Sequence, residues 1–384
     1  MPVGAPLGVP ARGRLSARIG MNVLALVTDA FGGFGGIARY NCDLLTALAR
    51  CDAGNRIVVL PRLARADRVE LPAGVRQLPA RGSKLGYACA AVRAATAEGP
   101  HDVVFCGHLN LAALGAAIAG LLGVPLWLQL YGIEAWDPIA RPRRWAAEHA
   151  SLVTAISRFT RRRFLRFNAI DPARVRVLPC TVDAGFVPGP KPDYLLDRHR
   201  LRGKKVLLTV GRLAPQERRK GHDRVIAALP ALSRTHPDLV YLVGGEGEDQ
   251  ARLADLATRL AVADRVLFTR SIEPDELADY YRVADVFVMP STQEGFGIVF
   301  LEAAACGLKP IGGNRDGSVD ALADGAIGIA IDPANPEDLV RAIDDALAGR
   351  GGDPTQVRRF ALENFTRQVR ALTQSHLLRS PAAA

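Results

Sequence analysis

The stretch KKVLLTVGRL, residues 204–213, predicts the fold of this chain. It reads as a buried strand that ends in a glycine and an arginine, and a helical pattern follows it. Short β-rich runs alternate with helical patterns in the same way over residues 22–178, and the alternation restarts here and continues to residue 331. Such alternation is typical of parallel βαβ units with helices on both faces of a sheet. The sequence therefore predicts an α/β protein with two doubly wound, Rossmann-like domains in tandem.

The two alternating regions are separated by DAGFVPGPKPD, residues 183–193, which holds three prolines and two glycines. This polar, extended composition indicates a linker, and a cleft should lie between the domains that it joins. We expect a disordered tail over residues 1–20, a first domain over 21–183, a linker over 184–194, a second domain over 195–353, and a C-terminal helix over 354–378 that packs back on the first domain.

The overall composition restricts the class of protein. The chain has 384 residues, of which 49% are hydrophobic, and this suffices for two globular domains. It holds no uninterrupted apolar run of about 18 residues, and its start lacks the apolar core of a secretory signal, so neither a transmembrane helix nor a signal peptide is predicted. The six cysteines form no C-x-x-C pair and read as reduced core residues, which favours a cytoplasmic protein.

The charge balance and one local cluster point to an anionic partner. The formal net charge is +10, which suggests an anionic partner; because arginine far outnumbers lysine, a generally arginine-rich composition is the equal alternative. In SRFTRRRFLRF, residues 157–167, aromatic residues alternate with Arg158, Arg161, Arg162, Arg163 and Arg166. The pattern suits the inner face of an anionic membrane or a lipid-phosphate acceptor, and equally a surface helix that docks its phenylalanines into the core. Nucleic-acid binding is not expected, because no recognised binding motif accompanies the charge.

A glycine-rich loop, TDAFGGFGGIARY, follows the first predicted strand and opens the first helix. Gly33, Gly35 and Gly36 would let the backbone come close to a ligand, and the helix N-terminus favours an anion. A dinucleotide site would need an acid at the end of the second strand, which reads RIVVLPR and has none. A flexible turn is the alternative interpretation.

Two further loops follow strands of the second domain. In VGRLAPQERRKGHDR, Arg212 and Lys220 flank a short loop and would form a diphosphate site together with free backbone N–H groups. The stretch lacks the P-loop pattern, and both cations could equally be solvated. In YLVGGEGED, Gly245 allows close backbone approach or a plain turn.

The segment EGFGIVFLEAAACG, residues 294–307, places Glu294 and Glu302 in apolar surroundings. The amides of Phe296 and Gly297 would lie at a helix start, where they could hold a phosphate. A buried carboxylate is costly unless it is satisfied, and sugar hydroxyls would satisfy it. An ion pair between Glu302 and a nearby arginine is the alternative.

In this order, the glycine loop, GRL, the Lys-Gly pair, GGEG and E-x7-E resemble the retaining glycosyltransferases of family 4, which have the GT-B fold. The resemblance covers residues 21–378 and is strongest over 205–331. It implies that Arg212 and Lys220 neutralise the diphosphate of a nucleotide sugar, that Glu294 contacts the hexose and Glu302 the ribose, and that the amides of Phe296 and Gly297 cradle the phosphate. It also implies that neither a metal nor another cofactor is needed, because the two cations replace Mg²⁺.

The chain departs from the family pattern at a few positions. Tyr131 stands where many members have His, and we expect it and Glu134 to position substrate. Asp320 stands where Glu is usual, and Arg270 stands where Gly is common near the expected base site. Arg218 and Arg219 lengthen the loop before Lys220.

The leading hypothesis is a cytoplasmic glycosyltransferase that takes a hexose from a UDP- or GDP-sugar, GDP-mannose among them. Its acceptor would be lipid-linked or a saccharide, in glycan or exopolysaccharide assembly. A sugar-nucleotide epimerase of the same fold is the second hypothesis. A degenerate, inactive partner subunit is the third, and Tyr131 in place of His is its support.

Overall fold

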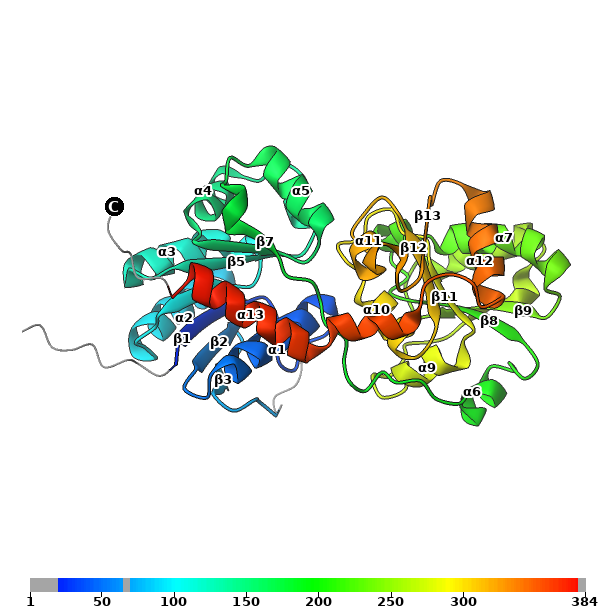
Figure 1. Ribbon diagram of the computed structural model, residues 1–384, viewed down its shortest axis with the longest axis horizontal. Coiled ribbons are helices and arrows are strands. Elements are labelled where there is room, and N and C mark those ends of the chain that lie inside the picture. The colour runs from blue at the N-terminus through cyan, green and yellow to red at the C-terminus, as the bar shows by residue number, and fades with distance from the viewer. Residues whose placement is uncertain (1–19, 65–69, 379–384) are drawn as a thin grey trace, which may run out of the picture.

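The computed structural model describes residues 20–64 and 70–378, so the predicted N-terminal tail lies almost wholly outside the described residues. Two separate parallel sheets, each with helices on both faces, form two domains that lie side by side (Figure 1). The predicted fold class, with two tandem Rossmann-like domains, is therefore confirmed.

The first domain contains a seven-stranded sheet in the order β3-β2-β1-β4-β5-β6-β7, and its strands pair in parallel. The strands are β1 Asn22–Val27, β2 Arg56–Pro61, β3 Val75–Gln77, β4 Val103–Cys106, β5 Leu126–Leu130, β6 Leu152–Ala155 and β7 Val175–Val177. The helices are α1 Gly36–Cys51, α2 Lys84–Ala97, α3 Ala112–Leu122, α4 Arg141–His149 and α5 Arg158–Phe167. Strand β3 and helix α4 were not predicted from the sequence.

The second domain contains a six-stranded parallel sheet in the order β10-β9-β8-β11-β12-β13. The strands are β8 Lys205–Val210, β9 Leu239–Gly244, β10 Val266–Phe268, β11 Val286–Met289, β12 Lys309–Gly313 and β13 Ile329–Ile331. The helices are α6 Asp193–Arg198, α7 His222–Thr235, α8 Gln250–Arg259, α9 Leu277–Val283, α10 Ile298–Ala305, α11 Ser318–Ala321 and α12 Pro336–Leu347. In both sheets the strand order reverses beside the first strand of the domain, which is where such sheets bind ligands.

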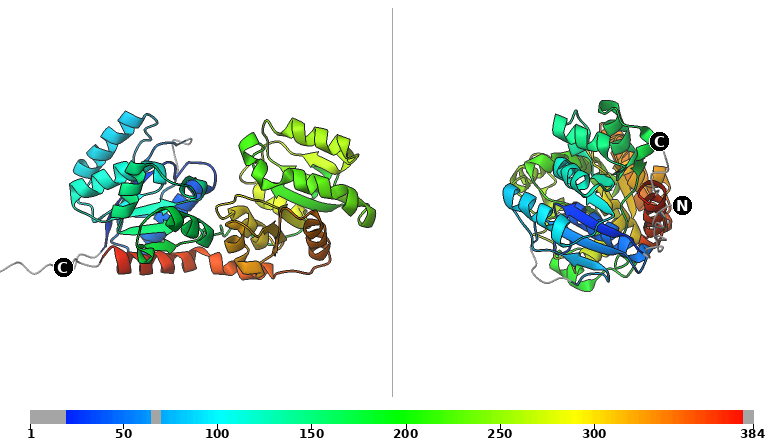
Figure 2. Two further views of the ribbon diagram at one scale, coloured as in Figure 1. Left: turned by 90° about the horizontal axis from the view of Figure 1, so that it is seen from above. Right: turned by 90° about the vertical axis from the view of Figure 1, so that its left-hand side faces the viewer.

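The chain crosses between the domains twice, first after β7 and again before the last helix, α13 Leu362–His376. The two crossings touch, because the amide of Val182 donates a hydrogen bond of 3.1 Å to the carbonyl of Phe360. Helix α13 then lies along the first domain (Figure 2). Its Phe365 ring packs edge-on against Tyr40 of α1, with ring centroids 5.8 Å apart, and Arg370 donates to the carbonyl of Cys51.

Most arginines of helix α5 form hydrogen bonds or ion pairs within the protein. Arg158 spans the two domains: its Nε donates to Asp320 at 2.7 Å and its second guanidinium nitrogen donates to Asp324 at 2.6 Å. Arg161 and Arg163 donate to backbone carbonyls of the first domain, and Phe164 is fully buried. A free surface of five arginines is therefore wrong, and only Arg162 and Arg166 stay exposed without an ion pair among the described residues.

Two features bear on the compartment of the protein. Over the described ranges, no helix combines the length and the apolar character needed to cross a membrane. Cys106, Cys180 and Cys306 are buried, as expected for core residues, whereas Cys89 is exposed on α2 and departs from that expectation.

Candidate functional site

The carboxyl ends of β8, β9 and β11 bring most of the predicted donor residues together. Arg212 follows β8, Gly245 follows β9, and Glu294 lies in the loop after β11. This is the point where the strand order of the second sheet reverses, and neighbouring helix N-termini face it.

Lys220 and Glu294 are direct neighbours. The Nζ of Lys220 lies 3.4 Å from a carboxylate oxygen of Glu294 and 3.7 Å from Glu217. The lysine stem packs over Gly211, where a Cβ would approach its Cδ to 3.2 Å. Lys220 ends a short 3-10 turn, Pro215–Lys220, so its side chain is held in place at the start of α7.

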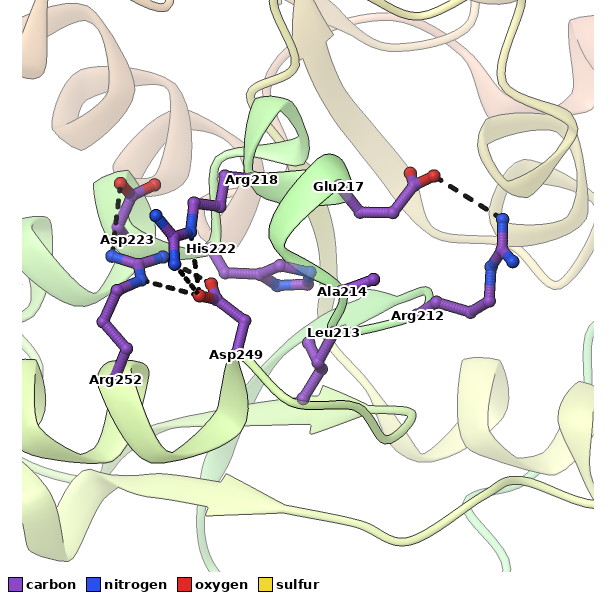
Figure 3. A pocket seen from close by; sticks show the side chains of 9 residues that line it. All are labelled: Arg212, Leu213, Ala214, Glu217, Arg218, His222, Asp223, Asp249 and Arg252. Atoms are coloured by element: carbon purple, nitrogen blue, oxygen red, sulfur yellow. Dashed lines mark hydrogen bonds and ion pairs between the residues drawn. The ribbon is translucent and has the colours of Figure 1, made fainter.

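Three cations surround Glu217, a residue that the sequence did not single out. Its carboxylate lies 3.6 Å from Arg212, 3.1 Å from Arg219 and 3.7 Å from Lys220. Arg212 has an 84% exposed side chain, so it can move toward a ligand (Figure 3). The cations predicted for a diphosphate are thus gathered at one place, around an internal carboxylate.

The inserted arginines have structural partners. Arg218 and Arg252 both bind the carboxylate of Asp249, at 2.7 and 2.6 Å, on the side of the pocket away from Arg212 (Figure 3). Behind them, burial lowers the pKa of His222 to about 4, and this ring meets the hydroxyl of Tyr241 at 3.0 Å. The longer loop is therefore fixed to α8 and carries Lys220 into the site.

Glu302 is held by a tyrosine. The hydroxyl of Tyr281, on α9, donates a hydrogen bond of 2.7 Å to Glu302, which lies about one turn into α10. Burial raises the pKa of Glu302, and the Tyr281 hydrogen bond and the charge of Arg39 oppose that shift. The predicted alternative, an ion pair with arginine, is not formed among the described residues.

Asp316 builds the turn that carries Glu294. One oxygen of its carboxylate accepts hydrogen bonds from the amide of Glu294 at 2.7 Å and from the hydroxyl of Ser291 at 3.1 Å. The other accepts from the amide of Ser318 at 2.9 Å. Asp316 is buried, so this acid fixes the backbone on which the donor acid sits.

We expect Asp316→Ala to destabilise the second domain by about 3 kcal/mol, because two buried donors and one partly buried donor lose their acceptor. Urea unfolding of the variant measures this change. As a control, Asp345→Ala removes an exposed ion pair with Arg350 and should cost less than about 1 kcal/mol. Equal stability of the two variants would contradict the role assigned to Asp316.

The start of α10 has no side-chain cap. Gly297 is its N-cap residue, with a φ of 91°. The ring of Phe296 is buried and packs edge-on against Phe360, so only the backbone of this residue can serve a ligand. The structure thus places both predicted amides at a helix N-terminus, where they suit an anion.

Gly245 acts through packing. It has a φ of 131°, and a Cβ there would lie 2.2 Å from the carbonyl oxygen of Gly211. Its amide already donates to the hydroxyl of Thr269, at 3.2 Å. Arg270, which follows Thr269 in the sequence, is exposed and forms no ion pair with the described part of the chain.

The glycine loop of the first domain faces α10. Gly35 is the N-cap of α1 with a φ of 89°, and a Cβ on Gly36 would lie 3.7 Å from Ile298. A Cβ on Gly33 would overlap the carboxylate of Asp29, so that glycine is required by the turn itself.

Tyr131 and Glu134 lie at the carboxyl end of β5. The hydroxyl of Tyr131 donates to the side chain of Asn41 at 2.6 Å, and its ring is buried, so the structure does not support a substrate-positioning role for this side chain. Its backbone does face the donor site: a Cβ on Gly295 would lie 2.3 Å from the carbonyl oxygen of Tyr131. Glu134 accepts the amide of Tyr131 at 2.6 Å and thereby fixes this loop.

Tyr281 and Asp316 were missed because partners distant in the sequence define their roles. Glu217 has its three cationic partners within five residues, and its local sequence was read only for the cations. Asp316 also had a local signal, since Asp before Gly-Ser commonly holds a turn. Over residues 20–64 and 70–378, no three His, Cys, Asp or Glu side chains are grouped so that they could hold a metal ion.

Two family models match the chain, one for each domain. The model of glycosyltransferase family 4 matches residues 34–186, and the model of glycosyl transferases group 1 matches residues 197–362.

Curated relatives and solved structures agree with these matches. The chain is 35% identical to the GDP-mannose-dependent α-(1-6)-phosphatidylinositol monomannoside mannosyltransferase of Mycolicibacterium smegmatis, over 73% of this chain and 77% of that protein. It is 28% identical to the D-inositol 3-phosphate glycosyltransferase of Acidothermus cellulolyticus, over 89% and 84%. The structure of Anabaena HepE with UDP and glucose aligns with a TM-score of 0.74 at 19% identity, over 92% of this chain and all of that one. This last likeness shows the fold.

Proposed function

Because this chain belongs to the family 4, group 1 glycosyltransferases, we propose that it transfers mannose from GDP-mannose to an inositol-containing lipid or saccharide. Glycosyl transfer from a nucleotide sugar follows from the family. The choice of mannose and guanine is supported by the relatives at 35% and 33% identity, which are named as GDP-mannose-dependent enzymes.

One observation carries the assignment of the donor site: Lys220 and Glu294 lie 3.4 Å apart at the strand-order reversal of the second sheet. Lys220, with the exposed Arg212, would neutralise the diphosphate together with the amides of Phe296 and Gly297. Glu294 would accept hydrogen bonds from the hexose, and Glu302 from the ribose. With these contacts, the bond between the hexose and the diphosphate would lie between the cations around Lys220 and the first domain.

We propose that the transfer retains the anomeric configuration. The bond between the sugar C1 and the diphosphate oxygen breaks while the bond from C1 to the acceptor oxygen forms on the same face. The acceptor's proton moves to the leaving phosphate. Arg212, Lys220 and the helix α10 amides stabilise the charge that develops there, so no metal ion or other cofactor is required.

The family membership favours transfer over the other two hypotheses. An epimerase would produce an epimeric sugar nucleotide without acceptor. An inactive partner subunit would have no need for the Lys220–Glu294 pair, whose members are both held in place by neighbouring residues.

The proposed donor is tested by measuring nucleoside-diphosphate release (GDP or UDP) and product formation with GDP-mannose, GDP-glucose, UDP-glucose and UDP-galactose. Phosphatidylinositol monomannoside in vesicles serves as the acceptor. GDP-mannose should be used at least about tenfold better than the others. Turnover with a UDP-sugar alone would overturn the guanine assignment, and an epimeric product without acceptor would reject transfer.

The affinity for GDP should fall on acidification at a pH above 4.5, the ordinary pKa of Glu. Burial raises the pKa of Glu302, so this carboxyl becomes protonated sooner as the pH falls and stops accepting the ribose hydroxyls. Titrations of GDP binding at a series of pH values measure the effect. In Glu302→Gln the affinity should be lower and should lose this pH dependence; an unchanged profile would exclude Glu302.

We also propose a peripheral contact with anionic membrane through Arg162 and Arg166, which are four residues apart on α5 and exposed. Cosedimentation with phosphatidylcholine vesicles, with and without phosphatidylserine, measures it. Arg162→Glu with Arg166→Glu should abolish the preference for anionic vesicles. Arg350→Glu, at an exposed site beyond α12, is the control; equal loss there would reject a defined surface.

A further inference from the structure

A polar cluster of the first domain lies across from the donor site and takes no part in the chemistry above. His108 follows β4, Glu134 lies in the turn after β5, and Arg143 lies in the first turn of α4. The turns that hold His108 and Glu134 are in contact at the carboxyl ends of the adjacent strands β4 and β5, and α4, which carries Arg143, packs against α3, the helix that follows the His108 turn.

The ring of His108 has a defined protonation state. The amide of Asn110 donates a hydrogen bond of 3.0 Å to its Nδ1, so the proton of the neutral ring is on Nε2. Burial lowers the pKa of His108 and the charge of Arg143 acts in the same direction, while Glu134 opposes them, so the ring is neutral at pH 7. Nε2 makes no hydrogen bond within the described residues and is not a buried atom. His108 thus presents an open N–H donor.

This donor is close to the reacting end of the donor site. The ring of His108 packs against that of Tyr131, with centroids 6.0 Å apart. The backbone of Tyr131 and Gly132 touches Gly295, beside Glu294. Because the Tyr131 hydroxyl is bonded to Asn41, His108 offers the hydrogen-bond donor that Tyr131 does not.

Glu134 and Arg143 complement this donor. One oxygen of Glu134 holds the amide of Tyr131, and the other is open to solvent. Arg143 forms no ion pair within 4 Å in the described part of the chain, although its charge acts on His108. A half-buried guanidinium without a carboxylate partner is suited to a phosphate.

We propose that His108, Glu134 and Arg143 form the acceptor subsite, and that the acceptor is a polyol that carries a phosphate group. His108 Nε2–H donates to the reacting hydroxyl oxygen, which leaves that hydroxyl's own proton free to move to the departing diphosphate. Glu134 accepts from a second hydroxyl, and Arg143 binds the acceptor phosphate. The inference rests on the proposed function and specifies its acceptor.

The first test compares two acceptors, phosphatidylinositol monomannoside in vesicles and phosphate-free methyl α-mannoside, with GDP-mannose as donor. Arg143→Gln should lower kcat/KM for the phosphate-bearing acceptor by roughly 10- to 100-fold and leave the other within about twofold. Arg141→Gln, an exposed neighbour on α4, is the matched control and should change neither. An equal loss with both acceptors, or no loss, would overturn the role of Arg143.

His108→Leu should lower kcat/KM for both acceptors by roughly 10- to 100-fold, because it removes the donor. His108→Gln, whose amide can reach the Nε2 position, should restore most of the rate. Hydrolysis of GDP-mannose without acceptor and the affinity for GDP should stay unchanged in both variants. A parallel loss in those two quantities would show that His108 is only structural.

A binding measurement decides the inference even if the donor assignment fails. Inositol 3-phosphate at millimolar concentration should shift the ring NMR signals of His108, which are assigned by their loss in His108→Gln. In Arg143→Gln the shift should need at least about tenfold more ligand, whereas myo-inositol should produce little shift in either protein. The absence of a shift in the native protein would overturn the subsite.

Discussion

Gly295→Ala should lower kcat/KM at least about 100-fold while leaving the affinity for GDP close to that of the native protein. The added Cβ would lie 2.3 Å from the carbonyl oxygen of Tyr131 and 3.3 Å from Ile156, so the two domains could not approach as they do. A displacement of about 1 Å between reacting groups costs this much rate. The nucleotide contacts proposed for Arg212, Lys220 and Glu302 lie in the second domain and should be kept.

Gly120→Ala provides the matched control for this substitution. Gly120 lies on α3 with nothing within 4 Å of its Cβ position, so alanine should leave the activity unchanged and slightly favour the helix. Steady-state rates and GDP titrations of the two variants separate domain approach from donor binding. Full activity of Gly295→Ala would show that the contact at Tyr131 is absent during turnover.

Lys220→Met should lower kcat by about 10²- to 10³-fold, the range found when one preorganised donor to a developing anion is removed. The ammonium lies 3.4 Å from Glu294 and the Lys220 side chain is 16% exposed, so bulk water cannot readily replace the ammonium. Single-turnover rates at saturating GDP-mannose isolate the chemical step. Arginine should restore little, because its planar fork differs in shape from the ammonium.

Lys204→Met tests the same change of side chain just before β8, the strand that precedes the Lys220 loop. Lys204 is exposed, and its loss should leave kcat within about twofold of the native value. If both variants lost activity alike, a general electrostatic effect would replace the assigned contact. If neither did, the diphosphate would be stabilised without Lys220.

The alternation of β-rich and helical patterns predicted the two domains and most elements, because parallel strands buried on both faces read as continuous apolar runs. Strand β3 and helices α4, α6 and α11 were missed, and the first two show the physical reasons. Strand β3, Val75–Gln77, is too short for periodicity to register. Helix α4 buries only Ala146 and Ala147, and its charged sequence lacks an apolar stripe.

The residues proposed for the donor site could be grouped from the sequence because they occur in local motifs at strand ends, and the structure brings Arg212, Lys220 and Glu294 to one edge of the second sheet. The roles of Tyr281, Asp316 and His108 depend on partners more than 20 residues away, or on a tautomer, and no local pattern encodes these. Tyr131 shows the converse, since its position in the sequence suggested substrate contact, whereas its hydroxyl is bonded within the first domain. Arg158 likewise belongs to a basic cluster in the sequence, but the structure pairs it with Asp320 and Asp324 of the second domain.

The hydrogen bond between Val182 and Phe360 links the two chain crossings, so we expect them to act together as one hinge. In the view of Figure 1, α5 and α11 lie above the place where the chain crosses between the domains, and Arg158 pairs with Asp320 there. Opening of the domains should therefore follow a single door-like rotation that separates Arg158 from Asp320 and leaves Phe296 and Phe360 together. Paired spin labels on α5 and α11 would report this swing as one broad distance change, whereas labels flanking the hinge would barely move.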